Sequence, residues 1–381
     1  MLYSMGSVML KILVYSAPLC KGTMKILFLT PYPQQEAPSQ RFRFEQYFQI
    51  LVKNGHSVEV RSFLTDRNWK ILYHEGRVLQ KCWILLTGFI KRIGTLFILP
   101  RFDFIFIHRE VTPVGPPVFE WAIAKVFRKK IIYDFDDSIW LTDKTQESWL
   151  EKILRWRNKV GSICAWSHKV SCGNLYLADY ARIFNSQVVV NPTTIDTESL
   201  HNRSITTAVK DDDSIRIGWT GSHSTLKYLT LLEPVLQKLE KDFSQVRILI
   251  IADRKPTLSL KRLDFLPWNK ATEAHDLAQM DVGIMPLPDD EWAKGKCGFK
   301  ALQYMAMEIP CVVSPVGVNT TIIDHGSNGF LAKSENEWLT SLTKLIDDKA
   351  LRKQFGKAGR KKIVDHFSVS SNQRNFLSLF E

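Results

Sequence analysis

Strand and helix signals alternate along this chain of 381 residues, and this alternation limits the folds that it can adopt. Short apolar runs that end at turns and lead into helical spacing are typical of buried parallel strands joined by helices. In the first part of the chain such runs occupy 24–32, 56–63, 102–108 and 130–135. A polar segment, 201–214, has no core pattern, and a second alternation follows it. The sequence therefore predicts an α/β protein with two doubly wound, Rossmann-like domains.

These patterns divide the chain into segments. Met24 begins the first strand run, and we expect the residues before it to be a poorly ordered extension. The predicted segments are the extension at 1–23, a first domain at 24–200, a linker at 201–214, a second domain at 215–365 and a terminal helix at 366–381.

The charge balance favours anionic partners. Lys and Arg number 51 against 39 Asp and Glu, a formal net charge of +12, which suits phosphates, nucleic acid or an anionic membrane. A solvated basic surface is the alternative. The six cysteines include no C-x-x-C pair, as expected of free thiols in a reducing cytosol. No apolar run is long enough to predict a spanning helix, so we expect a cytoplasmic protein.

A glycine-containing turn joins a strand and a helix at 217–227. Gly218 and Gly221 end the strand run, and Ser222, Thr225 and Lys227 follow. Glycines allow a ligand close to the backbone, and free N–H groups at a helix start favour an anion. The turn therefore predicts a phosphate site, and an ordinary turn with a serine cap is the alternative.

A second glycine-bracketed loop, which carries Lys296, opens a helix after Gly298. Ligands of parallel sheets bind outside the carboxyl ends of the strands, where such loops gather. Two basic helix starts at one crevice suit a diphosphate. Alternatively, Lys296 and Lys300 are solvated surface lysines.

Polar residues also end two strands of the first domain. His108 ends one strand run, and Asp134, Asp136 and Asp137 end the next. The histidine is either catalytic or a structural hydrogen-bonding group. The acidic residues could form a metal site, a helix cap or an acceptor site.

A basic stretch with aromatic residues, 69–101, has helical spacing. One interpretation is that it lies on an anionic membrane, which would hold the protein at the inner face of that membrane. The alternative is that it forms helices that face the core.

Together these segments resemble the retaining glycosyltransferases of family 4, which have the GT-B fold. The resemblance covers most of the chain from Met24 on and is strongest at 295–317 and 328–331. It implies that a nucleotide diphosphate-sugar binds in the cleft between two parallel sheets. It further implies sugar transfer with retention to a glycan or lipid-linked acceptor, without a metal or cofactor, in cell-surface polysaccharide or glycolipid synthesis. The terminal helix would cross back onto the first domain.

The motif departs from the family pattern of two glutamates with seven residues between them. Gly295 stands at the first glutamate and Gln303 at the second, where a neutral amide would hold the ribose. Trp219 stands where the family has an arginine for the diphosphate, while Lys227 keeps the family's lysine. We assign the missing charge to Lys296.

The resemblance implies two sets of site residues. The catalytic set is His108, Asp136, Asp137, Lys227 and Lys296. The donor-binding set is Gly221, Ser222, Thr225, Lys227, Trp268, Lys296, Cys297, Gly298, Phe299 and Gln303, with no metal ligand. Trp268 would stack on the base, and a core tryptophan is the alternative.

Other functions remain open. A nucleotide-sugar 2-epimerase shares the two-domain plan, and a sugar-nucleotide-binding protein without activity would tolerate the lost glutamates. A metal-dependent transferase would use Asp134 and Asp136. A dinucleotide oxidoreductase is disfavoured, because the first strand run ends in Thr30-Pro-Tyr and not in a Gly-x-Gly-x-x-Gly turn.

Overall fold

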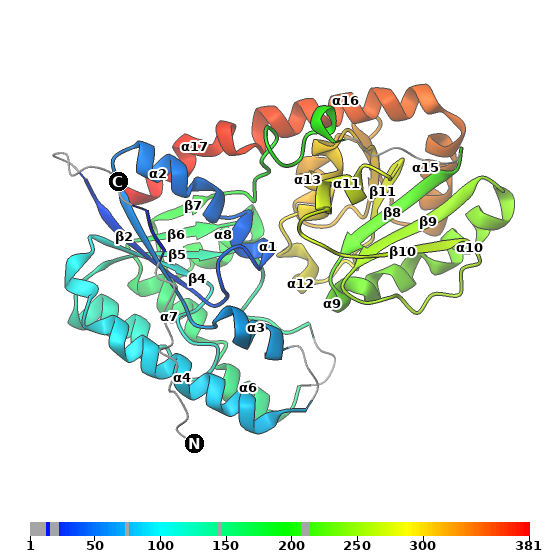
Figure 1. Ribbon diagram of the computed structural model, residues 1–381. Coiled ribbons are helices and arrows are strands. Elements are labelled where there is room, and N and C mark those ends of the chain that lie inside the picture. The colour runs from blue at the N-terminus through cyan, green and yellow to red at the C-terminus, as the bar shows by residue number, and fades with distance from the viewer. Residues whose placement is uncertain (1–12, 16–22, 73–75, 144–146, 207–212) are drawn as a thin grey trace, which may run out of the picture.

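The computed structural model forms two α/β domains that lie side by side, each built on its own sheet (Figure 1). It describes residues 13–15, 23–72, 76–143, 147–206 and 213–381. The α/β prediction is therefore confirmed. Most of the predicted extension at 1–23 lies outside the described residues, but residues 13–15 form a strand that the sequence analysis did not identify.

The sheet of the first domain has seven strands in the order β1-β3-β2-β4-β5-β6-β7. All neighbours are parallel except β1, which pairs antiparallel with β3. The strands are β1 (Leu13–Tyr15), β2 (Lys25–Thr30), β3 (Ser57–Ser62), β4 (Phe104–His108), β5 (Lys130–Phe135), β6 (Lys169–Cys172) and β7 (Val188–Val190).

The sheet of the second domain is entirely parallel, with six strands in the order β10-β9-β8-β11-β12-β13. The strands are β8 (Ile215–Gly221), β9 (Val246–Ala252), β10 (Leu263–Pro267), β11 (Val282–Met285), β12 (Cys311–Val313) and β13 (Gly329–Leu331). Sequence reasoning missed β10 because this edge strand is only partly buried and ends in a proline, which an edge position tolerates.

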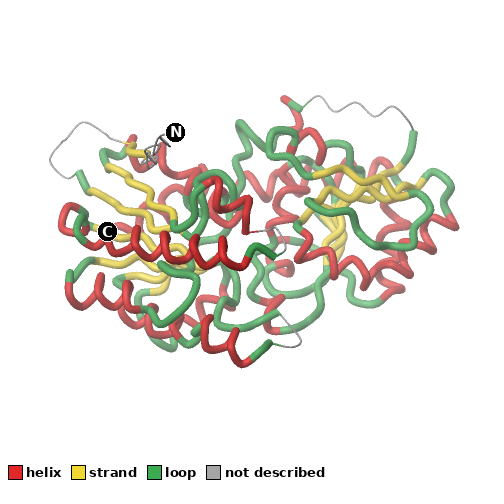
Figure 2. The backbone as a smooth tube through the Cα atoms, turned by 60° about the horizontal axis from the view of Figure 1, so that its bottom comes forward, coloured by secondary structure: helices red, strands yellow, loops and turns green. Residues whose placement is uncertain are grey.

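Helices cover the sheets, as Figure 2 shows from a second side. Those of the first domain are α1 (Pro38–Arg41), α2 (Phe48–Lys53), α3 (Asp66–Leu72), α4 (Val78–Leu96), α5 (Val118–Trp121), α6 (Trp149–Arg155), α7 (Lys159–Trp166) and α8 (Leu175–Arg182). Those that follow are α9 (His223–Leu226), α10 (Glu233–Asp242), α11 (Glu273–Leu277), α12 (Glu291–Lys294), α13 (Phe299–Ala306), α14 (Asn319–Ile322), α15 (Glu335–Asp347), α16 (Lys349–His366) and α17 (Val369–Leu377).

The last two helices connect the domains. Figure 1 shows α16 along the second domain and α17 over the first. Phe376 of α17 stacks on Tyr47 with ring centroids 4.2 Å apart, and it shares a buried cluster with Phe28 and Phe106 of the first sheet. Phe376 of α17 and Phe380 just after it thus pack on one face of the first sheet.

Candidate functional site

The turn after β8 is crowded by two side chains. A Cβ atom on Gly221 would lie 2.5 Å from Cη2 of Trp219 and 2.9 Å from Cε of Lys300, so only glycine fits here without a shift of its neighbours. Ser222 follows as the residue before α9, and its hydroxyl pairs with that of Ser224 at 2.8 Å. The backbone of Thr225 donates to the carbonyl of Ser222 at 2.9 Å.

Lys300 reaches this turn from α13 of the same domain. Its Nζ atom lies 5.2 Å from the centroid of the Trp219 ring. Burial lowers the pKa of Lys300 to about 7, the Lys296 charge adds to this effect, and Asp137 opposes it. No ion pair joins Lys300 to a carboxylate within the described parts of the chain. An anion at this turn would relieve the cost of that charge.

Lys296 lies in the loop between α12 and α13. Gly298 precedes α13 with a positive φ of 68°, a conformation that favours glycine. The Nζ atom of Lys296 lies 3.6 Å from Oδ1 of Asp137 in the first domain and 5.5 Å from the Trp292 ring centroid. The loop therefore presents its charge at the junction of the two domains.

Asn174 holds the same loop against the first domain. Its Nδ2 atom donates to the carbonyl oxygens of Lys294, Gly295 and Lys296 at 3.3, 3.1 and 3.0 Å. Its Oδ1 atom accepts from the backbone of Leu177 at 2.9 Å and caps α8. One amide thus fixes a helix start and binds the loop of the other domain.

Cys297 also meets the first domain. Its thiol donates to the carbonyl of Asp136 at 3.2 Å, and burial raises the pKa of this thiol well above its usual range. Cys297 is therefore a contact residue between the domains and not a reactive thiolate.

The two aspartates after β5 are paired with Arg109. Its Nε atom lies 2.9 Å from Oδ1 of Asp136, and a terminal nitrogen lies 2.8 Å from Oδ2 of Asp137. Arg109 has a left-handed φ of 60°, and its carbonyl accepts from the Tyr133 hydroxyl at 2.7 Å. Sequence reasoning missed this arginine, although it directly follows His108.

His108 is completely buried in a network with Asp134. Its Nδ1 atom lies 2.8 Å from Oδ2 of Asp134, whose other oxygen accepts from Arg43 and from the Ser171 hydroxyl. Burial alone would raise the pKa of Asp134, but the Arg43 and His108 contacts hold this pKa well below its usual range. The Nε2 atom of His108 has no hydrogen-bond partner within the described residues. A catalytic role for His108 stays a prediction.

Gln303 lies in the interior of the domain junction. It is 2% exposed, and its Nε2 atom lies 3.1 Å from Oε1 of Glu273 and 3.2 Å from Nε2 of His201. Glu273 in turn pairs with Arg41 of the first domain at 2.8 Å. A ribose could reach Gln303 only if these partners moved away.

Two predicted aromatic contacts also lie in packed surroundings. Trp268 is partly buried against a core cluster of the second domain, and Phe299 packs on Phe42 with ring centroids 4.5 Å apart. Phe42 directly follows α1 in the first domain, so its contact with Phe299 joins the two domains. Base stacking by Trp268 stays a prediction.

Lys227 faces the first domain at the edge of the junction. Its Nζ atom lies 3.2 Å from Oδ2 of Asp143. The Nζ atom of Lys227 also lies 5.5 Å from the centroid of the adjacent Tyr228 ring. Burial raises the pKa of Tyr228, and the charges of Lys296 and Lys227 both oppose that rise.

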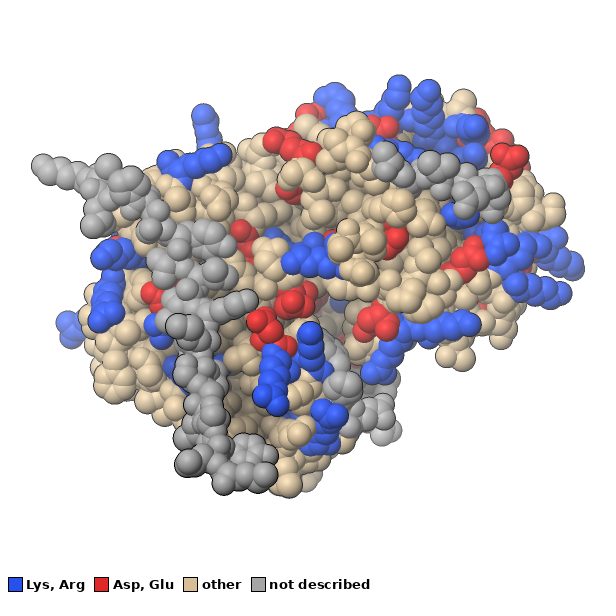
Figure 3. Space-filling model, viewed as in Figure 1, with Lys and Arg blue, Asp and Glu red and all other residues tan. Residues whose placement is uncertain are grey.

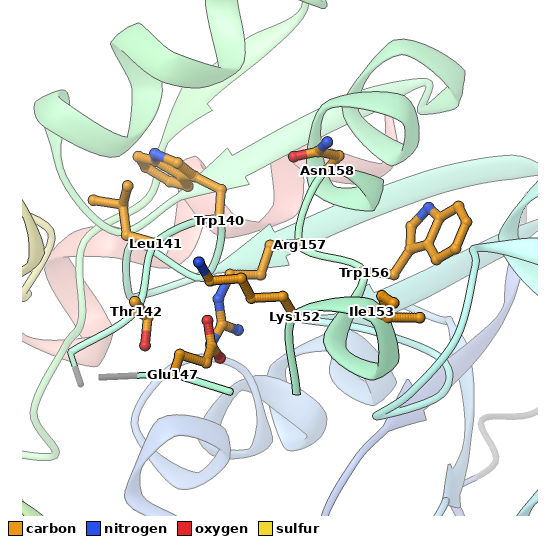
Figure 4. A pocket seen from close by; sticks show the side chains of 9 residues that line it. All are labelled: Trp140, Leu141, Thr142, Glu147, Lys152, Ile153, Trp156, Arg157 and Asn158. Atoms are coloured by element: carbon orange, nitrogen blue, oxygen red, sulfur yellow. The ribbon is translucent and has the colours of Figure 1, made fainter. Parts of the chain in front are cut away.

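A cavity of about 560 Å³ opens in the first domain next to this edge, between α6 and the loop after β5. Aromatic and basic side chains surround it (Figure 4). Trp140 stacks on Tyr180 with centroids 3.7 Å apart, and Arg157 pairs with Glu147. The lining residues are Trp140, Leu141, Thr142, Glu147, Lys152, Ile153, Trp156, Arg157 and Asn158.

Within the described residues, no group of three His, Cys, Asp or Glu side chains could hold a metal ion. In the same residues, no helix is long and apolar enough to cross a membrane.

A family model described as glycosyl transferases group 1 matches residues 214–348, which hold the second sheet and most of its helices. No curated protein matches the chain by sequence.

Solved structures resemble the whole chain. Sucrose-phosphate synthase from Thermosynechococcus elongatus has 13% identity and a TM-score of 0.68, covering 93% of this chain and 98% of that chain. HepE from Anabaena, solved with UDP and glucose, has 15% identity and a TM-score of 0.60, covering 93% and 99%. A putative UDP-N-acetylglucosamine 2-epimerase from Listeria monocytogenes has 10% identity and a TM-score of 0.52, covering 93% and 97%.

These similarities confirm the predicted GT-B fold. With the family match to the second domain, they support a glycosyltransferase. The fold alone does not separate transferases from epimerases, because both kinds of protein occur among the similar structures.

Proposed function

We propose that the protein transfers a sugar from a nucleotide diphosphate-sugar to an acceptor hydroxyl, with retention and in cell-surface polysaccharide or glycolipid synthesis. The observation that carries the donor class is the convergence of Lys300, Lys296 and the Gly221 turn beside the carboxyl end of β8. A diphosphate is the ligand whose charge fits these groups. The retaining outcome rests on the resemblance to family 4 at 295–317.

The lysines would act mainly as the sugar–phosphate bond breaks, because negative charge then grows on the leaving diphosphate. Fixed donors at a developing charge lower the barrier, and the loss of one such donor costs about 2.7–4 kcal/mol. Lys296 and Lys300 supply charge, while Ser222 and the turn's backbone supply hydrogen bonds. This scheme assigns the charge stabilisation to the chain's own residues and needs no resident metal.

The donor's ribose and base would meet Gln303 and Trp268 after the domains separate. The closed junction here, held by Asn174 and by the pair of Arg41 and Glu273, would then form again around the bound donor. Such closure excludes the water that would compete with the acceptor.

The cavity lined by Trp140 and Arg157 is the proposed acceptor site. Its aromatic rings suit a sugar or an apolar chain, and Lys152 and Arg157 suit a phosphate. It lies next to Asp143, which contacts Lys227 of the donor side. Asp136 and Asp137 would orient the acceptor hydroxyl.

A thermal-shift screen of nucleoside diphosphates and their sugars tests the donor class. A ligand at 100 times its dissociation constant stabilises the folded state by about 2.7 kcal/mol. Product analysis with the stabilising sugar then separates transfer from epimerisation. Stabilisation without turnover would indicate a binding protein, and no stabilisation by any diphosphate would refute the donor site.

A further inference from the structure

We propose that the outer face of α4, together with the neighbouring surface of α5 and α6, is a docking surface for an anionic lipid bilayer. The proposal concerns an interaction surface and does not depend on the reaction that the protein catalyses. The sequence left open whether residues 69–101 face a membrane or the core. One face of α4 packs against the core, and the proposal concerns its opposite, exposed face.

The outer face of α4 carries an unbroken apolar stripe. Large hydrophobic residues recur at intervals of three or four, which places them on one side of the helix. All of them are exposed, including Leu79 at 87%, Trp83 at 66% and Phe97 at 80%. The members of the stripe are Leu79, Trp83, Leu86, Ile90, Ile93 and Phe97.

The opposite face of α4 is fixed to the domain, so the stripe cannot turn inward. Arg92 is buried and donates to the carbonyl oxygens of Val111, Arg61 and Thr30 at 2.9, 2.8 and 2.8 Å. Gly88 lies against the Phe63 ring, where a side chain would clash. These contacts fix one face of α4 against the core of the domain and leave the stripe on the opposite face exposed.

The apolar surface continues onto the neighbouring helices. Phe89 of α4 lies 6.1 Å from Phe119 of α5, measured between ring centroids. The loop before α5 meets the end of α6, where the Gly115 backbone donates to the carbonyl of Leu154 at 2.7 Å. These neighbours add six exposed hydrophobic residues: Val118, Trp121, Trp149, Ile153, Leu154 and Trp156.

The charges near the stripe favour a bilayer over a second copy of the chain. Residues 76–102 contain no Asp or Glu, and four of their five Lys or Arg, all except the buried Arg92, are at least partly exposed. Two such surfaces would repel each other in a symmetric dimer, whereas anionic headgroups would attract them. Figure 3 shows Lys and Arg side chains beside uncharged surface on the lower part of the first domain, which carries α4 and α6 in Figure 1. Exposed tryptophans at the surface also suit the level of the headgroups.

The docking surface reaches the proposed acceptor cavity, because Ile153 and Trp156 belong to both. If the proposed function holds, a lipid-linked acceptor could enter this cavity without leaving the bilayer. This extension rests on the proposed function, whereas membrane docking does not.

Co-sedimentation with vesicles tests the docking surface without donor or acceptor. Wild-type protein should bind vesicles of phosphatidylcholine with phosphatidylglycerol, bind pure phosphatidylcholine less, and be released in part by salt. Replacing Trp83, Ile90 and Ile93 together by serine should weaken binding by roughly tenfold or more. The control variant replaces Leu231 and Val364, exposed hydrophobic residues of the second domain, by serine and should bind like wild type.

A probe on Cys82 gives a second measurement. Cys82 is exposed on α4, whereas Cys164, Cys172, Cys297 and Cys311 are buried. Cys20 lies outside the described residues, and the protein used for labelling carries Cys20→Ser so that the fluorophore reacts at Cys82. A polarity-sensitive fluorophore on Cys82 should shift to the blue with anionic vesicles. The same fluorophore on Leu231→Cys, in a Cys82→Ser background, should not shift.

Three results would overturn the proposal. Wild-type protein that fails to bind anionic vesicles is the first, and serine variants that bind as well as wild type are the second. The third is a dimer, detected by light scattering, that the triple substitution dissociates, because the stripe would then be a contact between two copies. An unchanged thermal unfolding temperature would show that the triple variant still folds. Vesicle binding is measured without donor or acceptor, so its outcome is independent of the proposed reaction.

Discussion

The Nζ atom of Lys296 in the second domain lies 3.6 Å from Oδ1 of Asp137 in the first. Asp137 also pairs with Arg109 at 2.8 Å, so one carboxylate is shared by two cations at the domain junction. A bound diphosphate would compete with Asp137 for Lys296. The pair therefore connects donor binding to the contact between the domains.

Substitutions of this pair should change nucleoside diphosphate affinity in opposite directions. Lys296→Ala should weaken binding by roughly tenfold to a hundredfold, because a charge-assisted contact contributes about 1.5–3 kcal/mol. Asp137→Asn should strengthen binding by about two- to fivefold, as expected for a partly exposed pair, while lowering the rate of transfer to the acceptor. Isothermal titration calorimetry measures both affinities.

Lys241→Ala, which removes an exposed lysine of α10, is the control and should bind like wild type. Unchanged affinity in Lys296→Ala would remove this lysine from the donor site.

The low pKa of Lys300 predicts that donor binding takes up a proton. Burial lowers this pKa to about 7, and a bound diphosphate would raise it. Affinity should therefore be constant below pH 7 as far as Lys300 is concerned, and should fall as the pH rises above it, by at most about tenfold per pH unit. Titrations in buffers of different ionisation enthalpy measure the proton uptake. Lys300→Met should lose it, and uptake that persists in this variant would contradict the assignment.

The fold could be predicted because each buried parallel strand is recognisable from its own short run of apolar residues. The run at Phe104–His108 is buried at every position. Its four consecutive apolar residues indicate this burial without any information about the strands beside it. Edge strands such as β10 are only partly buried and lack this signal.

The site was less predictable because its contacts join residues far apart in the chain. The sequence gives Lys300 only the alternative of a solvated surface lysine, yet its Nζ atom lies over the ring of Trp219 in another element. Asn174 donates hydrogen bonds to carbonyl groups more than a hundred residues away in the chain, and no spacing of residues in the sequence predicts such a bond. The same holds for Gln303, whose interior partners become apparent only when both domains are in place.

Asn174 should affect domain closure separately from helix capping. Asn174→Asp keeps the oxygen that caps α8 but removes the Nδ2 donor, so closure should weaken while the helix start stays satisfied. Asn174→Ala removes both and should lower the free energy of unfolding by a further ~1 kcal/mol. Small-angle X-ray scattering measures closure, and chemical denaturation measures stability. An Asn174→Asp protein as compact as wild type would show that this amide does not hold the domains together.

Two glycine-to-alanine substitutions should have opposite effects on stability. At Gly221 the added Cβ would clash with Trp219 and Lys300, so Gly221→Ala should destabilise the protein by about 1–3 kcal/mol and weaken diphosphate binding. At Gly94, within α4, nothing lies within 4 Å of the added atom, so Gly94→Ala should stabilise by about 1 kcal/mol. Thermal unfolding with and without nucleoside diphosphate tests both, and equal stability of the two variants would contradict the crowded turn.

The buried pair of Asp134 and Arg43 should contribute strongly to stability at neutral pH. Asp134→Asn would leave the Arg43 charge without its partner, at a cost of about 3–5 kcal/mol, whereas Asp179→Asn at an exposed pair should cost less than about 1 kcal/mol. The contacts hold the pKa of Asp134 below its usual range, so its stabilisation is complete above about pH 4 and is lost as the pH falls through the lowered pKa. The stability difference between wild type and Asp134→Asn, measured by urea denaturation, should therefore be constant near pH 7 and shrink only in strong acid. A difference that disappears between pH 5 and pH 7 would contradict the assignment of this stabilisation to Asp134.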